Sequence, residues 1–272
     1  MIFDVNAWVG TWPFRSLRDN TPETLVARLD RSGIQGAAVS QIEAMFHRNV
    51  QPANEKLVES IEPYRERLVP LATINPMYAG WERDLEACHQ SLGMRGVRLF
   101  PQYHDYEPDG SVARAVVSAC ADRGLPVFIP HRVEDIRERH WMDPGRVVEL
   151  DRLANLVAAC PDATIVIPNG RPIYRSALWR REELRDHSWF VDLSVAEIHY
   201  GLHKSTSSMR DLADVIEGGG AKHLLFGTHL PFSYAGPALV KRAILGVDAD
   251  TLADISYRSA SRILGIDLEI PA

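Results

Sequence analysis

Short apolar runs alternate with more polar segments along almost the whole chain. Eight of these runs lack the strict apolar–polar alternation of a half-exposed strand, so they predict strands that are covered on both faces, as in a parallel sheet. The predicted strands cover residues 2–5, 35–41, 67–75, 95–101, 125–130, 163–168, 189–194 and 222–227.

The segments between the strands are predicted to be helices. The first has a clear start signal, because Thr21 suits the N-cap position, Pro22 the first helical position and Glu23 the first turn. The predicted helices cover residues 21–33, 52–64, 81–92, 111–123, 146–160, 173–186 and 209–217, with two more after the last strand at 237–245 and 251–264.

Eight strands in regular alternation with helices predict an α/β fold, a single (β/α)8 TIM barrel, because right-handed crossovers of this number close most simply into a barrel. An open doubly wound sheet is the alternative. Such a sheet usually has a glycine-rich phosphate turn after its first strand, and residues 6–10 do not form one. No linker-like or low-complexity segment interrupts the pattern, so residues 1–272 are predicted to be one domain.

The composition of the chain argues against some classes of binding partner. The 272 residues carry a net charge of -6, and no Lys/Arg cluster is present, which argues against nucleic acid. The first residues do not resemble a signal peptide, and no apolar run approaches the ~18 residues that span a bilayer. Three cysteines without Cys-x-x-Cys spacing are typical of reduced thiols. We therefore expect a cytoplasmic protein with no membrane or nucleic-acid partner; a homo-oligomer remains open.

The chemically interesting residues follow the predicted strands. In a barrel, reactive groups lie at the carboxyl-terminal ends of the strands. These ends are rich in amides, histidines and arginines, and arginine forks match carboxylates, so a small polar or carboxylate-bearing ligand is expected. The main candidates are Asn6, Trp8, Trp12, Arg98, His131, Arg132, Asn169 and His229.

Four segments carry a resemblance to a known family. Asp4–Gly10, Gly96–Pro101, Leu125–Ile129 and Leu225–Pro231 occur in the same order and on the same strands as the sequence signatures of the amidohydrolase-related family. That family contains metal-dependent hydrolases and decarboxylases with a (β/α)8 barrel. The resemblance covers nearly the whole chain, and it implies the same fold and a related activity.

The departures from the family pattern concern its metal ligands. The family binds its metal through two histidines of the opening segment, histidines on strands five and six, and an aspartate after strand eight. At the corresponding places this chain has Asn6, Trp8, Pro130 next to His131, Asn169, and His229. Asparagine is a poor zinc ligand, and tryptophan and proline are none. We therefore expect no metal and no other cofactor; a divalent metal such as zinc in a site rebuilt around His131 and His229 is the alternative.

A second group of potential ligands follows the seventh strand. His199 and His203 are four residues apart and would share a helix face, and Glu197 is nearby. We interpret these residues as solvated or capping side chains rather than as a zinc site.

Without a metal, the expected site works by acid–base chemistry. His229 is the first candidate for the general base and His131 the second, while Asn6 and Asn169 would donate hydrogen bonds to a developing oxyanion. Arg98 and Arg132 would bind a substrate carboxylate. For Arg132, however, an ion pair with Glu134 or Asp135 is the better interpretation. Trp8 and Trp12 would form an apolar wall, or Trp8 would simply plug the pocket.

The sequence therefore predicts an amidohydrolase-like hydrolase that cleaves a C–N, ester or lactone bond of a small polar or carboxylate metabolite. Two alternatives remain: a non-catalytic barrel that binds a metabolite or a partner, and a metal enzyme with a rebuilt site.

Overall fold

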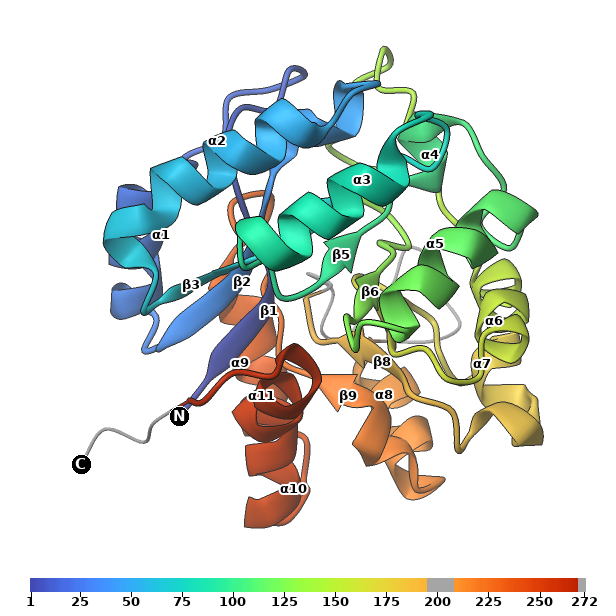
Figure 1. The fold of residues 1–272 in the computed structure, drawn as a ribbon. Coiled ribbons are helices and arrows are strands. Elements are labelled where there is room, and N and C mark those ends of the chain that lie inside the picture. The colour runs from blue at the N-terminus through green and yellow to red at the C-terminus, as the bar shows by residue number, and fades with distance from the viewer. Residues whose placement is uncertain (195–207, 269–272) are drawn as a thin grey trace.

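The strands form a closed parallel barrel (Figure 1). The structure is a computed structural model, and it describes residues 1–194 and 208–268. Every neighbouring pair of strands is parallel, and each strand follows its neighbour in chain order. The strands are β1 (Phe3–Val9), β2 (Gly36–Gln41), β3 (Leu68–Pro70) with its continuation β4 (Ala72–Thr73), β5 (Val97–Arg98), β6 (Val127–Phe128), β7 (Ile165–Ile167), β8 (Trp189–Asp192) and β9 (Leu224–Leu225).

Hydrogen bonds between the first and last strands close the barrel. The amide of Val5 donates to the carbonyl of Phe226 at 3.0 Å, and the amide of Trp8 donates to the carbonyl of Leu230 at 2.8 Å. Because β3 and β4 are two parts of one strand interrupted at Leu71, the barrel has eight strands. The predicted (β/α)8 fold is confirmed.

Helices surround the barrel, as Figure 1 shows. Most of them occupy the predicted segments. Their bounds are α1 (Pro22–Arg31), α2 (Gln51–Ile61), α3 (Trp81–Glu86), α4 (Pro101–His104), α5 (Ser111–Ala121), α6 (Leu150–Ala159), α7 (Ala177–Arg180), α8 (Ser208–Glu217), α9 (Ala235–Ala243), α10 (Ala249–Ala253) and α11 (Ser259–Leu264).

Three local predictions differ from the structure. The first strand continues to Val9 instead of ending at residue 5. The short helix α4 was not expected; Pro101 starts it, and Asp105 ends it in the left-handed conformation. The predicted helix 173–186 forms only as α7 and a 3-10 helix at Glu182–Leu184. Its first turn is absent, because the amides of Ile173 and Tyr174 donate to the carboxylate of Asp211.

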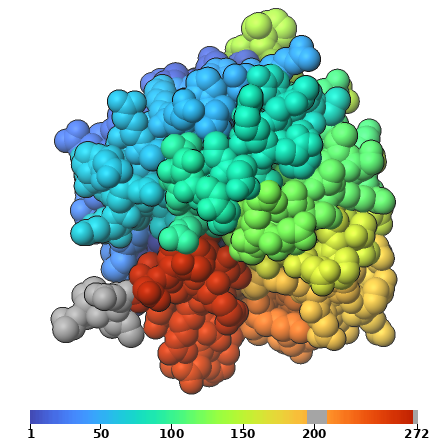
Figure 2. Space-filling view, viewed as in Figure 1, coloured from blue at the N-terminus to red at the C-terminus, as the bar shows by residue number. Residues whose placement is uncertain are grey.

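Apolar side chains form three clusters, one around the barrel and two within it. The largest cluster lies between the strands and the surrounding helices. A second cluster fills the lower barrel interior, where Phe3, Phe128 and Phe190 meet Ala260 and Leu264 of α11. The C-terminal helices thus close the amino-terminal end of the barrel, and Figure 2 shows them packed directly against earlier parts of the chain. The third cluster is aromatic and covers the carboxyl-terminal end.

Among the described residues, none of the helices has the length and apolar character needed to cross a membrane.

Candidate functional site

β1 contains an irregularity just before Trp8, one of the candidate residues. The pairing with β2 shifts between Asp4 and Ala7, which places an extra residue in β1. The ring of Trp8 consequently lies 5.8 Å from that of Phe100, which follows β5. Since β1 and β5 are not neighbours in the barrel, this contact crosses its interior.

Asp192, at the end of β8, organises the polar residues of the mouth. Its carboxylate accepts hydrogen bonds from Asn6 Nδ2 at 2.8 Å, from the backbone amide of Asn169 at 3.0 Å and from Ser194 Oγ at 2.6 Å. The side chain is fully buried, so these donors replace the water that it would otherwise bind. Sequence reasoning missed Asp192, although a carboxylate at the end of a buried apolar strand was a usable signal.

His229 is hydrogen-bonded at both ring nitrogens and joins the same cluster through Nδ1. Nε2 lies 2.6 Å from the carbonyl oxygen of Val133, which can only accept, so Nε2 carries the proton. Nδ1 is then the acceptor for Trp8 Nε1 and Asn169 Nδ2, each at 3.3 Å. Burial, partly offset by the Val133 carbonyl, lowers the pKa of His229 to about 3, so the ring is neutral at neutral pH.

The backbone at the mouth adopts a conformation that side-chain-bearing residues rarely take. His229 has φ 65° and Asn169 has φ 59°, both in the left-handed region. Such residues are concentrated at functional sites, where the surrounding structure holds them. Here the two residues bond to each other, so the conformation sets the geometry of the cluster.

His131 has a different hydrogen-bond pattern from His229. Its Nδ1 lies 2.7 Å from the carbonyl oxygen of Val148, so Nδ1 carries the proton and Nε2 keeps its lone pair. No partner for Nε2 occurs among residues 1–194 and 208–268. Burial lowers the pKa of His131 to about 4, and the hydrogen bond with the Val148 carbonyl partly opposes this shift. His131 is therefore a neutral ring at neutral pH, and its Nε2 has an available lone pair.

Arg98 places a guanidinium group in the barrel interior. The side chain is fully buried, and its carbon Cζ lies 3.9 Å from the centroid of the Trp8 ring. None of its three nitrogens has a hydrogen-bond partner in the described part of the chain. Burial lowers the pKa of Arg98 to about 9, although Asp192 and Asp4 favour the charged form. Nitrogens of this kind are normally paired when they are buried.

Aromatic rings cover the mouth above Arg98. Trp8 and Trp12 both contact Phe232, with ring centroids 5.8 and 5.0 Å apart. Trp12 also packs against Phe46 and Tyr103. Trp8 is fully buried and Trp12 nearly so, which fits the predicted apolar wall and equally the alternative in which Trp8 plugs the pocket.

Ion pairs connect the loops around the mouth. Arg132 lies 3.6 Å from Asp135, as the ion-pair interpretation predicted. Glu134 instead accepts two hydrogen bonds from Arg15, at 3.0 Å each. Arg15 also donates to the carbonyl of Phe232 at 2.9 Å, so it joins the loops that follow β1, β6 and β9.

The comparison with protein families identifies the ancestry of this barrel. The sequence model described as amidohydrolase matches residues 11–266. The chain belongs to the amidohydrolase family. Its members are enzymes, in agreement with the family resemblance of the sequence. No curated protein matches the chain by sequence.

Solved structures share the fold over almost the full length of the chain. A 5-carboxyvanillate decarboxylase from Sphingomonas paucimobilis has a TM-score of 0.73 and 15% identity, covering 98% of this chain and 99% of that one. A 2,6-dihydroxybenzoate decarboxylase from Rhizobium has a TM-score of 0.70 and 17% identity, and the match covers 97% of this chain and 98% of that one. A dihydroxybenzoic acid decarboxylase from Polaromonas has a TM-score of 0.71 and 16% identity, and the match covers 97% of this chain and 96% of that one. Its structure contains bound manganese and the inhibitor 2-nitroresorcinol.

These structures correct one expectation and leave another unconfirmed. The expectation that no cofactor takes part is wrong, because bound manganese in structures of this fold points to a divalent metal as the cofactor of the family. The hydrolase prediction is not confirmed, since the three neighbours named above are decarboxylases.

The described residues of this member of the amidohydrolase family do not fit a manganese ion. Residues 1–194 and 208–268 contain no group of three or more histidine, cysteine, aspartate or glutamate side chains that could hold one. Both nitrogens of His229 are already hydrogen-bonded, and Asn6 Nδ2 points to Asp192. The alternative metal site around His131 and His229 is therefore not formed by these residues, and no step is derived through a metal. Glu197, His199 and His203 lie outside the described residues.

Proposed function

We propose that this amidohydrolase-family protein is an enzyme that binds a small carboxylate with an aromatic or other apolar body at the carboxyl-terminal mouth of its barrel. The observation that carries the proposal is the buried guanidinium of Arg98 without a hydrogen-bond partner among the described residues. A cation in this position costs free energy unless an anion compensates it.

The orientation of Arg98 supports carboxylate binding. The five N–H groups of a guanidinium lie in its plane and form a fork that matches the two oxygens of a carboxylate. Trp8 stacks on the face of the group and leaves the donors at its edge free. Trp8 therefore holds the fork in position, because its own indole nitrogen is fixed by Asn6 and His229.

The surrounding side chains suit a substrate with an apolar body. Trp12, Phe100 and Phe232 offer ring faces and edges that pack against planar groups. The similar structures are enzymes named for aromatic acids, dihydroxybenzoate and carboxyvanillate, which is consistent with such a substrate. Their names alone do not define the substrate of this chain, because the identities are 15% and 17%.

Arg98 is proposed to hold a carboxylate that survives the reaction. Loss of that same group as CO2 would leave the buried guanidinium without its anion, so strong binding there would favour the ground state over the transition state. The bond that breaks therefore lies elsewhere on the substrate. Water would add to the carbonyl carbon of an ester, lactone or amide while His131 Nε2 accepts its proton, and the ring would then return that proton to the oxygen or nitrogen that leaves as the C–O or C–N bond breaks. The roles of His229 and Asn169 would be to position the reacting group. This assigns ester, lactone or amide hydrolysis as the first reaction type.

Decarboxylation at a second carboxylate is the other candidate reaction. The activities named for the similar structures favour it. Both reactions use the same binding group, so Arg98 tests the shared part of the proposal and product analysis separates the two.

The experiment is a turnover assay on small aromatic carboxylates that carry an additional ester, lactone, amide or carboxylate group. Each compound is assayed with and without added manganese, and CO2 release and hydrolysis products are measured separately. Arg98→Gln is expected to lower kcat/KM at least ~100-fold, because a charge-assisted bidentate contact is lost. Arg98→Lys keeps the positive charge and should therefore lower kcat/KM less than Arg98→Gln does.

Arg31→Gln, an exposed arginine on α1, is the matched control and should leave turnover unchanged. If no compound turns over but carboxylates bind to wild type and not to Arg98→Gln, the protein is the non-catalytic binding barrel. Equal turnover by wild type and Arg98→Gln would contradict the proposal.

A further inference from the structure

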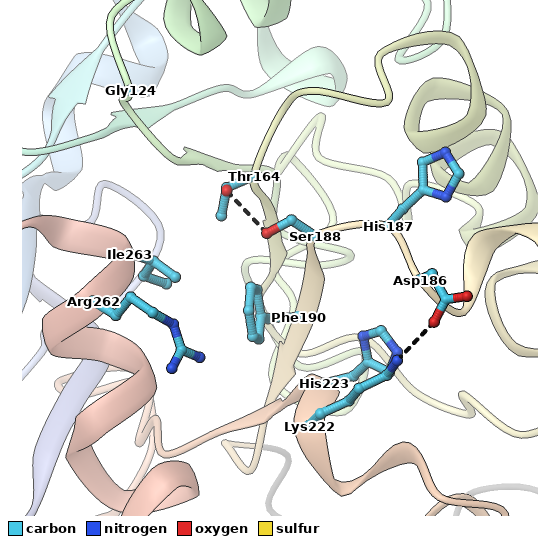
Figure 3. A pocket seen from close by; sticks show the side chains of 10 residues that line it. All are labelled: Gly124, Thr164, Asp186, His187, Ser188, Phe190, Lys222, His223, Arg262 and Ile263. Carbon is cyan, nitrogen blue, oxygen red and sulfur yellow. Dashed lines mark hydrogen bonds and ion pairs between the residues drawn. The ribbon is translucent and has the colours of Figure 1, made fainter.

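A cavity lies at the opposite end of the barrel from the aromatic mouth. It has a volume of about 460 Å³, within the roughly 300–1,000 Å³ typical of small-molecule sites. Its walls come from the segments that lead into β6, β7, β8 and β9 and from α11 (Figure 3). The lining residues are Gly124, Thr164, Asp186, His187, Ser188, Phe190, Lys222, His223, Arg262 and Ile263.

Two cationic side chains line this cavity. Arg262 extends from α11 toward Phe190 in Figure 3. Its Nη2 donates to Ser259 Oγ at 3.2 Å, and no carboxylate lies within ion-pair distance of it in the described part of the chain. Lys222 lies across the cavity and forms an ion pair with Asp186 at 3.1 Å. The Asp186 side chain is 95% exposed, so this pair is weak and Lys222 can turn to another anion.

Hydroxyl groups complete the polar wall. Thr164 Oγ1 and Ser188 Oγ are 3.0 Å apart, and whichever accepts in this bond can direct its own proton into the cavity. His223 is fixed by the carbonyls of Trp189 and Arg185 and stacks on Trp189 with the ring centroids 3.9 Å apart. Its position is therefore rigid, and it forms a wall behind Lys222.

We propose that this cavity binds the phosphate group of a small phosphorylated molecule. Arg262 and Lys222 would hold the phosphate oxygens, with a hydroxyl of Thr164 or Ser188 as a further donor. Phe190 and Ile263 supply an apolar surface for the body of the ligand. The site is separate from the proposed carboxylate site, because Arg98 stacks on Trp8 within the barrel and does not line this cavity.

The test is a titration with inorganic phosphate and with phenyl phosphate, at constant ionic strength set with chloride. Binding is followed by the amide resonances of Ser188, Phe190 and Lys222. We expect saturable shifts with a dissociation constant of roughly millimolar for inorganic phosphate, and several-fold tighter binding of phenyl phosphate, because only the latter contacts the apolar wall.

Three variants test the assignment. Arg262→Gln should weaken phosphate binding at least ~10-fold through loss of a charge-assisted contact. Arg258→Gln removes the same charge from the neighbouring helical segment, where it pairs with Asp250, and should bind like wild type. Asp186→Asn should bind roughly threefold tighter, because it removes a negative charge and frees Lys222.

The proposal is overturned if the shifts do not saturate, or if Arg262→Gln and wild type bind phosphate equally. Loss of binding in Arg258→Gln as well as in Arg262→Gln would indicate a general charge effect and would also reject the site. Because Asp186→Asn predicts a gain, misfolding of a variant cannot imitate the full set of results.

Discussion

The two ends of the barrel handle polar groups in opposite ways. At the mouth, Asp192, Asn169 and His229 are buried and bonded to one another, and aromatic rings cover them. At the other end, Lys222 and Asp186 are largely exposed and border an open cavity. The mouth therefore has fixed geometry, whereas the opposite end has side chains that can rearrange around a ligand.

Arg98 is the exception within the ordered mouth. The carboxylates and amides around it have their partners, but its guanidinium nitrogens have none among the described residues. A set of satisfied groups around one unsatisfied cation is the arrangement expected of a binding site held ready for an anion.

The largest expected effect comes from comparing an aspartate-to-alanine substitution at each end of the barrel. Asp192→Ala removes a buried acceptor of several hydrogen bonds and should lower the free energy of unfolding by about 3–5 kcal/mol. Asp186→Ala removes an exposed carboxylate and should change it by less than about 0.5 kcal/mol. Urea denaturation measures both. Similar losses for the two variants would remove the distinction between the ends.

The second prediction separates a functional from a structural role of Arg98. Arg98→Met keeps most of the side-chain length and removes the unpaired charge, so the free energy of unfolding should stay equal or rise by about 1 kcal/mol or more. Carboxylate binding should be lost at the same time. A marked loss of stability, measured by the same denaturation, would show that the guanidinium stabilises the fold.

The third prediction concerns acid stability. The pKa of His229 is about 3 in the folded protein and about 6.5 in an unfolded chain, so only the unfolded state takes up this proton between those values. Stability should therefore fall as pH decreases from about 6.5 toward 3, by about 1.4 kcal/mol per pH unit for this residue. His229→Gln should reduce the slope of stability against pH by that amount. An unchanged slope would contradict the buried, neutral histidine.

Much of the fold could be predicted from the sequence because apolar runs and turn residues are local signals. All eight predicted strands have counterparts, whereas the helix predicted for 173–186 lacks its first turn because Asp211, far along the chain, binds the first amides. The candidate site was predictable as a set of strand ends, which gave Asn6, Arg98, Asn169 and His229.

The ranking of the two histidines was less predictable. Whether a histidine keeps a free nitrogen depends on carbonyls from distant segments, Val133 for His229 and Val148 for His131. Asp192 was missed for a similar reason, since its importance comes from partners on other strands. The expectation that a cofactor is absent failed because it rested on single positions instead of on the family as a whole.

The most direct test of the carboxylate site uses the indole resonance of Trp8, one of six tryptophans, assigned through Trp8→Phe. Trp8 stacks on Arg98 at 3.9 Å, so an anion that reaches the guanidinium must change the environment of the indole. Benzoate should shift this resonance saturably in wild type and not in Arg98→Met, and uncharged benzamide should have no effect. A benzoate shift of equal size in Arg98→Met, or none in wild type, would contradict the account.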